Sequence, residues 1–217
     1  MLTFYHTPLS PNSRRVWITL LEKHLPFTEV VMTLQGDQLT PEFLALNPFH
    51  HIPVLVDDGF RVLESLAILD YLEAKYPEPA LLPRDPQSLA VVRMAQMVAL
   101  NELSPASGPL VGQWLGMSEL DEAKATQARD KVAHVLGFLE KLLADAPYFG
   151  GDSLSVADIV CGISMGWFPA LGIPMSYSLN AWLTRLQQRL SWQHTQPTAE
   201  AIEGFKARMQ ARRSHPS

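Results

Sequence analysis

The residue types best suited to chemistry in this chain fall in two short segments, residues 50–56 and 63–65. The first segment, His50-His51-Ile52-Pro53-Val54-Leu55-Val56, is an apolar strand that is entered through a proline. A proline there cannot donate to the strand ladder, and a cis X-Pro bond that turns the preceding polar backbone outward is its expected use. Glu64 and Ser65 then place a carboxylate and a hydroxyl at the start of a helix. A backbone edge beside these two groups suits a peptide-like ligand that carries an amine and a thiol.

A third segment, Ser10-Pro11-Asn12-Ser13, lies where the first predicted strand meets the first predicted helix. A helix N-terminus offers free N–H groups and positive potential, and a hydroxyl that donates to a sulfur anion adds a charge-assisted hydrogen bond. Together these contacts can supply the about 2 to 3 kcal/mol that lowering a thiol pKa by about 1.5 to 2 units requires. On the residues alone, however, Ser10 is better interpreted as a helix N-cap followed by Pro11 as the first helical residue.

The bulk properties limit the function classes. The 217 residues are enough for one large domain or two small ones, and the net charge of −5 argues against a general affinity for nucleic acid or anionic membrane. The single cysteine, Cys161, excludes an intrachain disulfide framework and favours a reducing compartment. No secretory signal follows Met1, and prolines and glycines interrupt the apolar stretch 159–175, which we predict to be a buried core helix. We therefore expect a cytoplasmic protein without nucleic-acid or membrane partners.

The chain contains two successive regions with different patterns of apolar residues. Up to residue 76, short β-type runs alternate with helical patterns, and Asp57-Asp58-Gly59 is typical of a hairpin turn. The predicted strands are 2–5, 27–32, 54–56 and 61–63, and the predicted helices are 11–23, 41–46 and 65–76. This order indicates a mixed four-stranded sheet with helices packed on it, an α/β domain.

The second region is helical. Residues 77–87 are rich in proline and form a predicted linker. Beyond them the sequence predicts helices at 88–115, 119–145, 155–168, 178–190 and 198–212, with a kink at the prolines of 104–109. Ser155 and Asp158 form a capping-box pattern, and Cys161 on the same apolar helix is expected to be buried.

Three motifs in this order carry a family resemblance: Asn47-Pro48-Phe49-His50-His51-Ile52-Pro53-Val54-Leu55, Glu64-Ser65-Leu66-Ala67-Ile68-Leu69-Asp70-Tyr71-Leu72, and Ser155-Val156-Ala157-Asp158. With an α/β domain followed by an all-α domain, the chain resembles the soluble glutathione transferase family over essentially its whole length. The surroundings of Ser10 are most similar to the serine-type theta and phi classes, with bacterial and cyanobacterial relatives, including the chi class, as alternatives. The resemblance implies a thioredoxin-like glutathione-binding domain at residues 1–76, a linker at 77–87 and an all-α domain with an electrophile pocket at 88–217.

The resemblance implies a cytosolic, homodimeric enzyme that conjugates the glutathione thiolate to small apolar electrophiles in detoxification. Glutathione would be a co-substrate, with no tightly bound cofactor and no metal. Adjacent histidines such as His50 and His51 point apart, and no third ligand is evident beside them. The alternatives are a glutathione-dependent peroxidase, isomerase or dehalogenase on the same site, or a catalytically silent glutathione-binding or partner module.

The same resemblance assigns residue roles. Ser10 would donate to the thiolate, with Ser13, Arg15 and Tyr5 as alternatives; Arg14 and Arg15 are otherwise expected to be solvated helix charges. Val54, or alternatively Ile52, would provide the main-chain contact to the cysteinyl part of glutathione. The predicted glutathione-binding residues are Gln38, His50, His51, Ile52, Pro53, Val54, Glu64 and Ser65. The predicted electrophile-binding residues are Leu9, Pro11, Leu110, Trp114 and Phe168.

One subsite departs from the family pattern. Serine-type relatives often carry a basic pair before Asn47-Pro48, where this chain has Gln38 and Leu39. We expect His50 and His51 to take over the contact with the glycine carboxylate, because a partly charged imidazole can bind a carboxylate.

Overall fold

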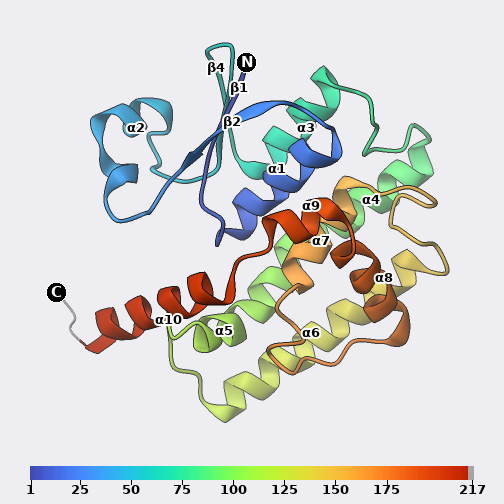
Figure 1. Cartoon of the computed structure of the whole chain (residues 1–217). Helices are drawn as coiled ribbons and strands as arrows, with labels where there is room; N and C mark the ends of the chain where they lie inside the picture. Colours follow the sequence, from blue (N-terminus) through green and yellow to red (C-terminus); the bar gives the residue numbers. More distant parts are fainter. Residues whose placement is uncertain (215–217) are drawn as a thin grey trace. The chain divides into compact units, whose positions relative to one another are not determined.

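The protein, represented by a computed structural model, is described for residues 1–214 (Figure 1). Two compact units can be distinguished by their internal packing. The N-terminal unit comprises Met1–Leu81 and the separate segment Leu190–Gln196, and the helical unit comprises Leu82–Arg189 and resumes at Pro197. The boundaries expected from the sequence, at residues 76 and 88, remain predictions.

A four-stranded mixed sheet forms the centre of the N-terminal unit. Its strands are β1 (Leu2–His6), β2 (Phe27–Val31), β3 (Val54–Asp57) and β4 (Phe60–Leu63), in the order β2-β1-β3-β4. Strand β1 is parallel to β2 and antiparallel to β3, and β3 is antiparallel to β4. Asp58 and Gly59 both have positive φ, 48° and 86°, as the tight turn predicted there requires. The predicted mixed sheet is confirmed.

Helices cover both faces of this sheet (Figure 1). They are α1 (Pro11–Glu22), α2 (Pro41–Leu46) and α3 (Ser65–Lys75), with a short 3-10 turn at Asp37–Leu39. Side chains alternate along a strand, so that Tyr5 and His6 of β1 point to opposite faces. Tyr5 packs on Phe43 of α2 at 6.1 Å between ring centroids, whereas His6 packs on Trp17 of α1 at 4.7 Å. Helices α1 and α3 contact each other. Helix α2 and strands β1, β3 and β4 contain all the residues predicted for them. Met32, predicted as the last residue of the second strand, lies outside β2, because the pairing with β1 ends at His6 and Val31.

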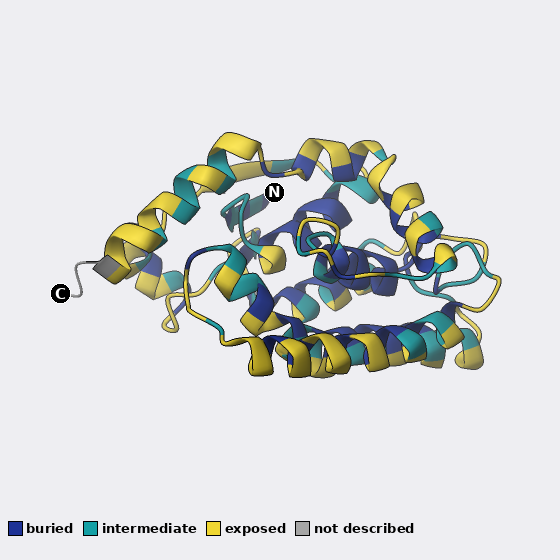
Figure 2. Ribbon diagram, turned by 90° about the horizontal axis from the view of Figure 1, so that it is seen from below, coloured by how far each residue is buried: buried dark blue, intermediate teal, exposed yellow. Residues whose placement is uncertain are grey.

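The helical unit is built around α7. Its helices are α4 (Pro86–Val98), a π-helical turn (Ala99–Leu103), α5 (Ser104–Trp114), α6 (Glu122–Leu143), α7 (Val156–Met165), α8 (Tyr177–Gln187) and α10 (Ala199–Ser214). Nearly every residue of α7 is buried, and α4 and α8 pack against it. In contrast, α10, which leads to the C-terminus, has no buried residue over 199–213 (Figure 2).

A network around Asp158 fixes the start of α7. The Asp158 carboxylate accepts hydrogen bonds from the Ser155 N–H at 2.8 Å and the Ser155 hydroxyl at 2.6 Å, which confirms the predicted reach-back contact of a capping box. It also accepts from the Phe149 N–H at 2.9 Å and the Trp182 Nε1–H at 2.8 Å. Cys161 on the same helix is buried, as predicted, and its thiol lies 3.5 Å from the carbonyl oxygen of Ala95.

Two helical features differ from the sequence-based expectation. The irregular turn lies at Ala99–Leu103, just before the segment where a kink was predicted, and α5 runs through Pro105 and Pro109. The physical reason is that Pro105 has no N–H for the Asn101 carbonyl, so the backbone adjusts in the preceding turn. A short helix, α9 (Leu190–Thr195), was not predicted, and it belongs to the N-terminal unit. None of the helices within residues 1–214 is both long and apolar enough to cross a membrane.

Candidate glutathione site and electrophile-binding residues

A cavity of about 380 Å³ opens on the N-terminal unit. It is bounded by the start of α1, the loop after β2, the segment between α2 and β3, and the start of α3. Its lining consists of Asn12, Leu34, Gln38, Asn47, His50, His51, Ile52, Pro53, Glu64 and Ser65. Segments that are far apart in the sequence therefore meet here, and polar side chains predominate among them.

All the predicted glutathione contacts except Val54 line this cavity. Val54 is fully buried in β3, where it pairs with Tyr5 of β1 and Leu63 of β4. Ile52, which precedes the cis Ile52–Pro53 bond, does line the cavity. The cis bond predicted from the sequence is confirmed, and Ile52 is now the better supported of the two main-chain contacts that the sequence left open.

The backbone is strained at three positions around this cavity. Leu34, His50 and Glu64 have φ values of 57°, 50° and 66°. Non-glycine residues avoid this region, and each such residue costs on the order of 1 to 3 kcal/mol unless its surroundings hold it. Such strain concentrates at ligand-binding sites. The sequence contains no glycine at these positions that would have pointed to left-handed backbone.

Glu64 and Ser65 form the polar wall at the start of α3. Glu64 is exposed, and within the described chain its side chain makes no capping hydrogen bond, while its carbonyl accepts from the Ile68 N–H at 2.9 Å. The Glu64 side chain therefore does not act as an ordinary helix cap. Ser65 is buried and is the first residue of α3, where helix N–H groups favour a negatively charged group.

Two loops shape the opposite wall. Asn47 holds the segment before β3, because its Nδ2 donates to the His51 carbonyl at 2.8 Å and its Oδ1 accepts from the Phe49 N–H at 3.0 Å. In the loop after β2, the Asp37 carboxylate accepts from the Thr33 N–H at 2.6 Å. Burial raises the pKa of Asp37, but hydrogen bonds from the Thr33 N–H and hydroxyl, and from neighbouring backbone, outweigh it and lower the pKa. This ionised carboxylate closes the loop that carries Leu34 and Gln38.

Ser10 is the N-cap of α1. Its hydroxyl oxygen accepts from the Ser13 N–H at 3.3 Å. A hydroxyl has two lone pairs and one proton, so that this contact leaves the Ser10 proton available for a sulfur anion. Ser13 is fully buried and its Oγ lies 3.4 Å from the Thr7 N–H, while Tyr5 is half-buried against Phe43. Ser10 is half-buried, and the residues that line the cavity include none of these three hydroxyl candidates, so that the choice of Ser10 as donor stays a prediction.

The two arginines of α1 are not solvated. Arg14 and Arg15 are only 4% and 5% exposed, so the expectation of solvated helix charges is wrong. Helix α1 is covered by neighbouring elements along both of these positions, which the sequence pattern did not reveal. Arg15 Nη1 donates to Asn12 Oδ1 at 2.6 Å, and Asn12 lines the cavity. Asn12 was not predicted as a contact, although it lies inside the Ser10–Ser13 segment that was singled out.

The predicted electrophile-binding residues lie in both units. In the N-terminal unit, Leu9 is half-buried and Pro11 is exposed. In the helical unit, Leu110 and Phe168 are buried, while Trp114 is half-buried. The Trp114 ring packs on Trp167 at 5.1 Å, and Lys206 Nζ lies 4.2 Å from its ring centroid. Neither contact of Trp114, Trp167 or Lys206, was predicted. Trp167 could have been found from the sequence, because it is an aromatic residue directly before Phe168.

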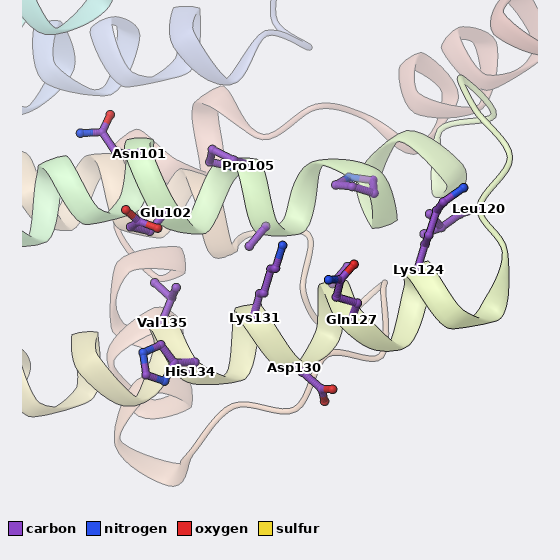
Figure 3. Close-up of a pocket in the computed structure, with 13 residues that line it drawn as sticks. Asn101, Glu102, Pro105, Leu120, Lys124, Gln127, Asp130, Lys131, His134 and Val135 are labelled. Atoms are coloured by element: carbon purple, nitrogen blue, oxygen red, sulfur yellow. The ribbon is translucent and has the colours of Figure 1, made fainter.

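A larger cavity of about 670 Å³ lies on the helical unit between α5 and α6 (Figure 3). Pro105, Ala106 and Pro109 line one side, and Lys124, Gln127 and Lys131 project into it from α6. None of the predicted site residues lines this groove. Over the described residues, no cluster of three or more histidine, cysteine or acidic side chains is arranged to hold a metal ion.

Known proteins of one family are similar to this chain in sequence and in structure. Residues 4–80 match the model "Glutathione S-transferase, N-terminal domain", and residues 89–189 match "Glutathione S-transferase, C-terminal domain". Glutathione S-transferase D7 of Drosophila melanogaster is 36% identical over 162 residues, which cover 73% of this chain and 71% of the relative. Glutathione S-transferase 2 of Saccharomyces cerevisiae is 32% identical, with coverages of 88% and 87%.

A solved delta-class glutathione transferase of Nilaparvata lugens superposes with a TM-score of 0.81 at 27% identity, covering 97% of this chain and 99% of that one. A mixed sheet with a polar cavity at the start of α3, followed by an all-helical unit, defines a thioredoxin-like domain joined to a helical domain. The chain belongs to the glutathione S-transferase family.

Proposed function

We propose that this protein binds glutathione in the cavity of its N-terminal unit and transfers the glutathione thiolate to apolar electrophiles. The observation that carries the proposal is the cavity that gathers Gln38, Ile52, Glu64 and Ser65 around one opening. The relatives, named as glutathione S-transferases, favour conjugation over peroxidase, isomerase or dehalogenase chemistry and over a silent binding module.

The tripeptide has three polar regions, and the cavity offers a partner for each. Glu64 would bind the α-amine of the γ-glutamyl group, and Ser65 at the start of α3 would bind its carboxylate. The main chain at Ile52 would pair with the cysteinyl residue in the manner of an added strand. His50, His51 and Gln38, which line the cavity, would meet the glycine end.

The protein's main chemical task is to ionise the thiol. A free thiol has a pKa of about 8.5, so that only a few per cent is thiolate at neutral pH. The Ser10 hydroxyl and the N-terminus of α1 would lower this pKa by donating to, and attracting, the sulfur anion. No covalent enzyme intermediate is needed, because holding the thiolate beside an electrophile supplies the rest of the acceleration.

Leu9 and Pro11 in the N-terminal unit, and separately Trp114 in the helical unit, are the candidates for contact with the electrophile. Leu110 and Phe168 are buried within the helical unit, which favours a role in its packing over direct contact with the electrophile. The Trp114–Trp167 pair supplies flat apolar area suited to an aromatic electrophile.

We propose that the protein acts as a homodimer in the cytoplasm. The groove between α5 and α6 carries both charge signs at its edge, with Lys124 and Lys131 on one hand and Glu102 and Asp130 on the other. A two-fold interface presents the same patch twice, so that opposite charges can pair across it. The single cysteine of the sequence, Cys161, is buried, which is consistent with a reducing compartment.

The direct test is an ultraviolet titration of bound glutathione in the wild type and in Ser10→Ala. We expect thiolate absorbance at neutral pH in the wild type, and an apparent thiol pKa about 1 to 2 units higher in the variant, the size expected for loss of one charge-assisted hydrogen bond. Isothermal calorimetry serves as the control for binding. If calorimetry detects no glutathione uptake by the wild type, the proposed function fails; an unchanged titration in Ser10→Ala would move the donor to Ser13 or Arg15.

A further inference from the structure

Arg14 is a buried cation without a counter-ion. Its side chain is 4% exposed, and among residues 1–214 no carboxylate lies within ion-pair distance of it. Its Nη2 donates to the neutral Gln196 Oε1 at 3.0 Å, and its Nε has no hydrogen-bond partner in the described chain. Burial lowers the pKa of Arg14 to about 10, which still leaves the group charged at neutral pH. Burying a charge without a counter-ion costs free energy. We therefore asked which function this charge could serve.

The position of Arg14 on α1 relates it to Ser10. The Arg14 N–H donates to the Ser10 carbonyl at 3.0 Å, one helical turn apart. Helical side chains lean toward the N-terminus of their helix, so that we expect the Arg14 side chain to run back toward the first turn of α1. Its positive charge therefore adds to the positive potential of the helix terminus on which Ser10 lies.

Gln196 reaches Arg14 from the other end of the chain. It directly follows α9, which lies along α1: Ser191 donates to Glu22, and the His194 ring packs on Trp17 at 5.5 Å. The amide of Gln196 is an acceptor that orients the guanidinium without neutralising it. A glutamate here would form an ion pair and cancel the charge.

The other charged or titratable groups near α1 do not fill the role of counter-ion. On α1 itself, Arg15 is bound to Asn12, and Glu22 and Lys23 lie at the opposite end. On α3, Glu73 is paired with Lys23 and Asp70 is exposed; on α9, His194 contacts Trp17. On β1, burial lowers the pKa of His6 despite its neighbour Glu29, so that His6 is neutral.

We propose that Gln196 is a positioning residue, which holds the Arg14 guanidinium beside the first turn of α1 as an uncompensated positive charge that favours the thiolate form of bound glutathione. The inference rests on the proposed function. It adds a residue from the segment after α9 to the machinery of the first unit.

The decisive variant is Gln196→Glu, which keeps the shape of the side chain and gives Arg14 a carboxylate. We expect the apparent pKa of bound glutathione, followed by thiolate absorbance against pH, to rise by about one unit, as a nearby charge typically shifts a pKa. The variant is expected to fold at least as stably as the wild type. The matched control is Gln193→Glu, which adds the same charge to exposed α9 surface and is expected to leave the titration unchanged.

Arg14→Met is the second variant. It removes the buried charge, so that we expect an equal or higher melting temperature together with a raised thiol pKa. A Gln196→Glu protein that binds glutathione and titrates like the wild type would overturn the proposal, whatever its stability. So would equal shifts in Gln196→Glu and Gln193→Glu. A wild type that binds no glutathione would instead refute the proposed function, which separates the two failures.

Discussion

Ser10 can serve the fold and a ligand at the same time. Its oxygen accepts from the Ser13 N–H, and its proton remains free to point at a sulfur. The two interpretations that the residues left open, a helix cap and a thiolate donor, are therefore compatible. The cap also fixes the hydroxyl in place, so that the entropy of orienting it is already spent when a ligand arrives.

Unlike the Ser10 side chain, the Glu64 side chain does not cap its helix. Its backbone is held at a φ of 66°, yet its side chain contributes no capping bond within the described residues. A strained backbone together with a side chain that does not cap its own helix supports the proposed contact of Glu64 with a ligand.

Glu64→Gln tests this explanation, because it removes the charge and keeps the shape. We expect KM for glutathione to rise about tenfold, since a charged hydrogen bond is worth about 1.5 kcal/mol more than a neutral one at such a site. The melting temperature should not change. Initial-rate kinetics and thermal unfolding measure the two effects, with Glu42→Gln on exposed α2 as control. A KM equal to that of the wild type would remove Glu64 from glutathione recognition.

The individual contacts were partly predictable. The motifs that predicted ligand contacts contain residues that do line the cavity, namely His50, His51, Pro53 and Ser65. Leu34 could not be found, because its presence depends on a left-handed backbone that an ordinary leucine does not signal. The burial of Arg14 and Arg15 depends on elements remote in sequence, which local periodicity cannot show.

At the scale of the elements, strong local signals were reliable. Three features with local physical causes were predicted correctly: the hairpin turn at Asp58-Gly59, the prolines that begin α1 and α2, and the capping contact of Asp158 with the Ser155 N–H at the start of α7. The π-helical turn at Ala99–Leu103 and the short helix α9 were missed. Pro105 accounts for the π-helical turn, but a proline does not specify which preceding turn will adjust. Helix α9 depends on its packing against α1.

The groove between α5 and α6 makes an element-scale prediction about assembly. Lys131→Glu would leave Glu102, Asp130 and the new carboxylate together on one patch (Figure 3). If this patch is the dimer interface, we expect dissociation to become easier by at least about tenfold, through a loss of about 1.4 kcal/mol or more. Sedimentation velocity over a dilution series measures this.

Lys141→Glu, exposed on the same helix but outside the groove, is the matched control. Equal dissociation of the two variants would attribute the effect to net charge. A Lys131→Glu protein that stays as associated as the wild type would place the interface elsewhere.

At the scale of the whole molecule, the class of fold was predictable because the two halves differ in periodicity. Alternating strand and helix patterns stop near the proline-rich segment, and the four-stranded mixed sheet follows from the strand order. The assignment of residues 190–196 to the first unit was not predictable, because the sequence of that segment does not indicate which helix or strand it packs against.

We expect the acid stability of the whole molecule to depend on Asp57. Burial raises the pKa of this carboxyl, but hydrogen bonds from Lys75, Tyr71 and Tyr76 outweigh burial and lower it. A carboxyl with a lowered folded-state pKa stabilises the fold above its unfolded pKa of about 3.9, and this stabilisation is lost as the pH falls through the folded value.

We therefore expect Asp57→Asn to be less stable than the wild type at pH 7, by about 2 kcal/mol for the charged hydrogen bonds removed. The difference should shrink below about pH 4, because the wild-type carboxyl is then protonated as well. Urea unfolding at a series of pH values, with exposed Asp145→Asn as control, measures it. Stability curves that stay parallel down to the lowest pH would assign the acid sensitivity to other carboxylates.

The packing of α9 against α1 has a consequence for biosynthesis. Residues 190–196 leave the ribosome only after almost all of the helical unit has been made, although they complete the unit whose other residues emerge first. Until then, the side of α1 that carries Arg14 and Trp17 has no cover from His194 and Gln196. Residues 1–81 therefore remain without this cover until residues 190–196 have been synthesised, and a polypeptide truncated after residue 81 would keep that apolar and cationic surface exposed to chaperones and to aggregation.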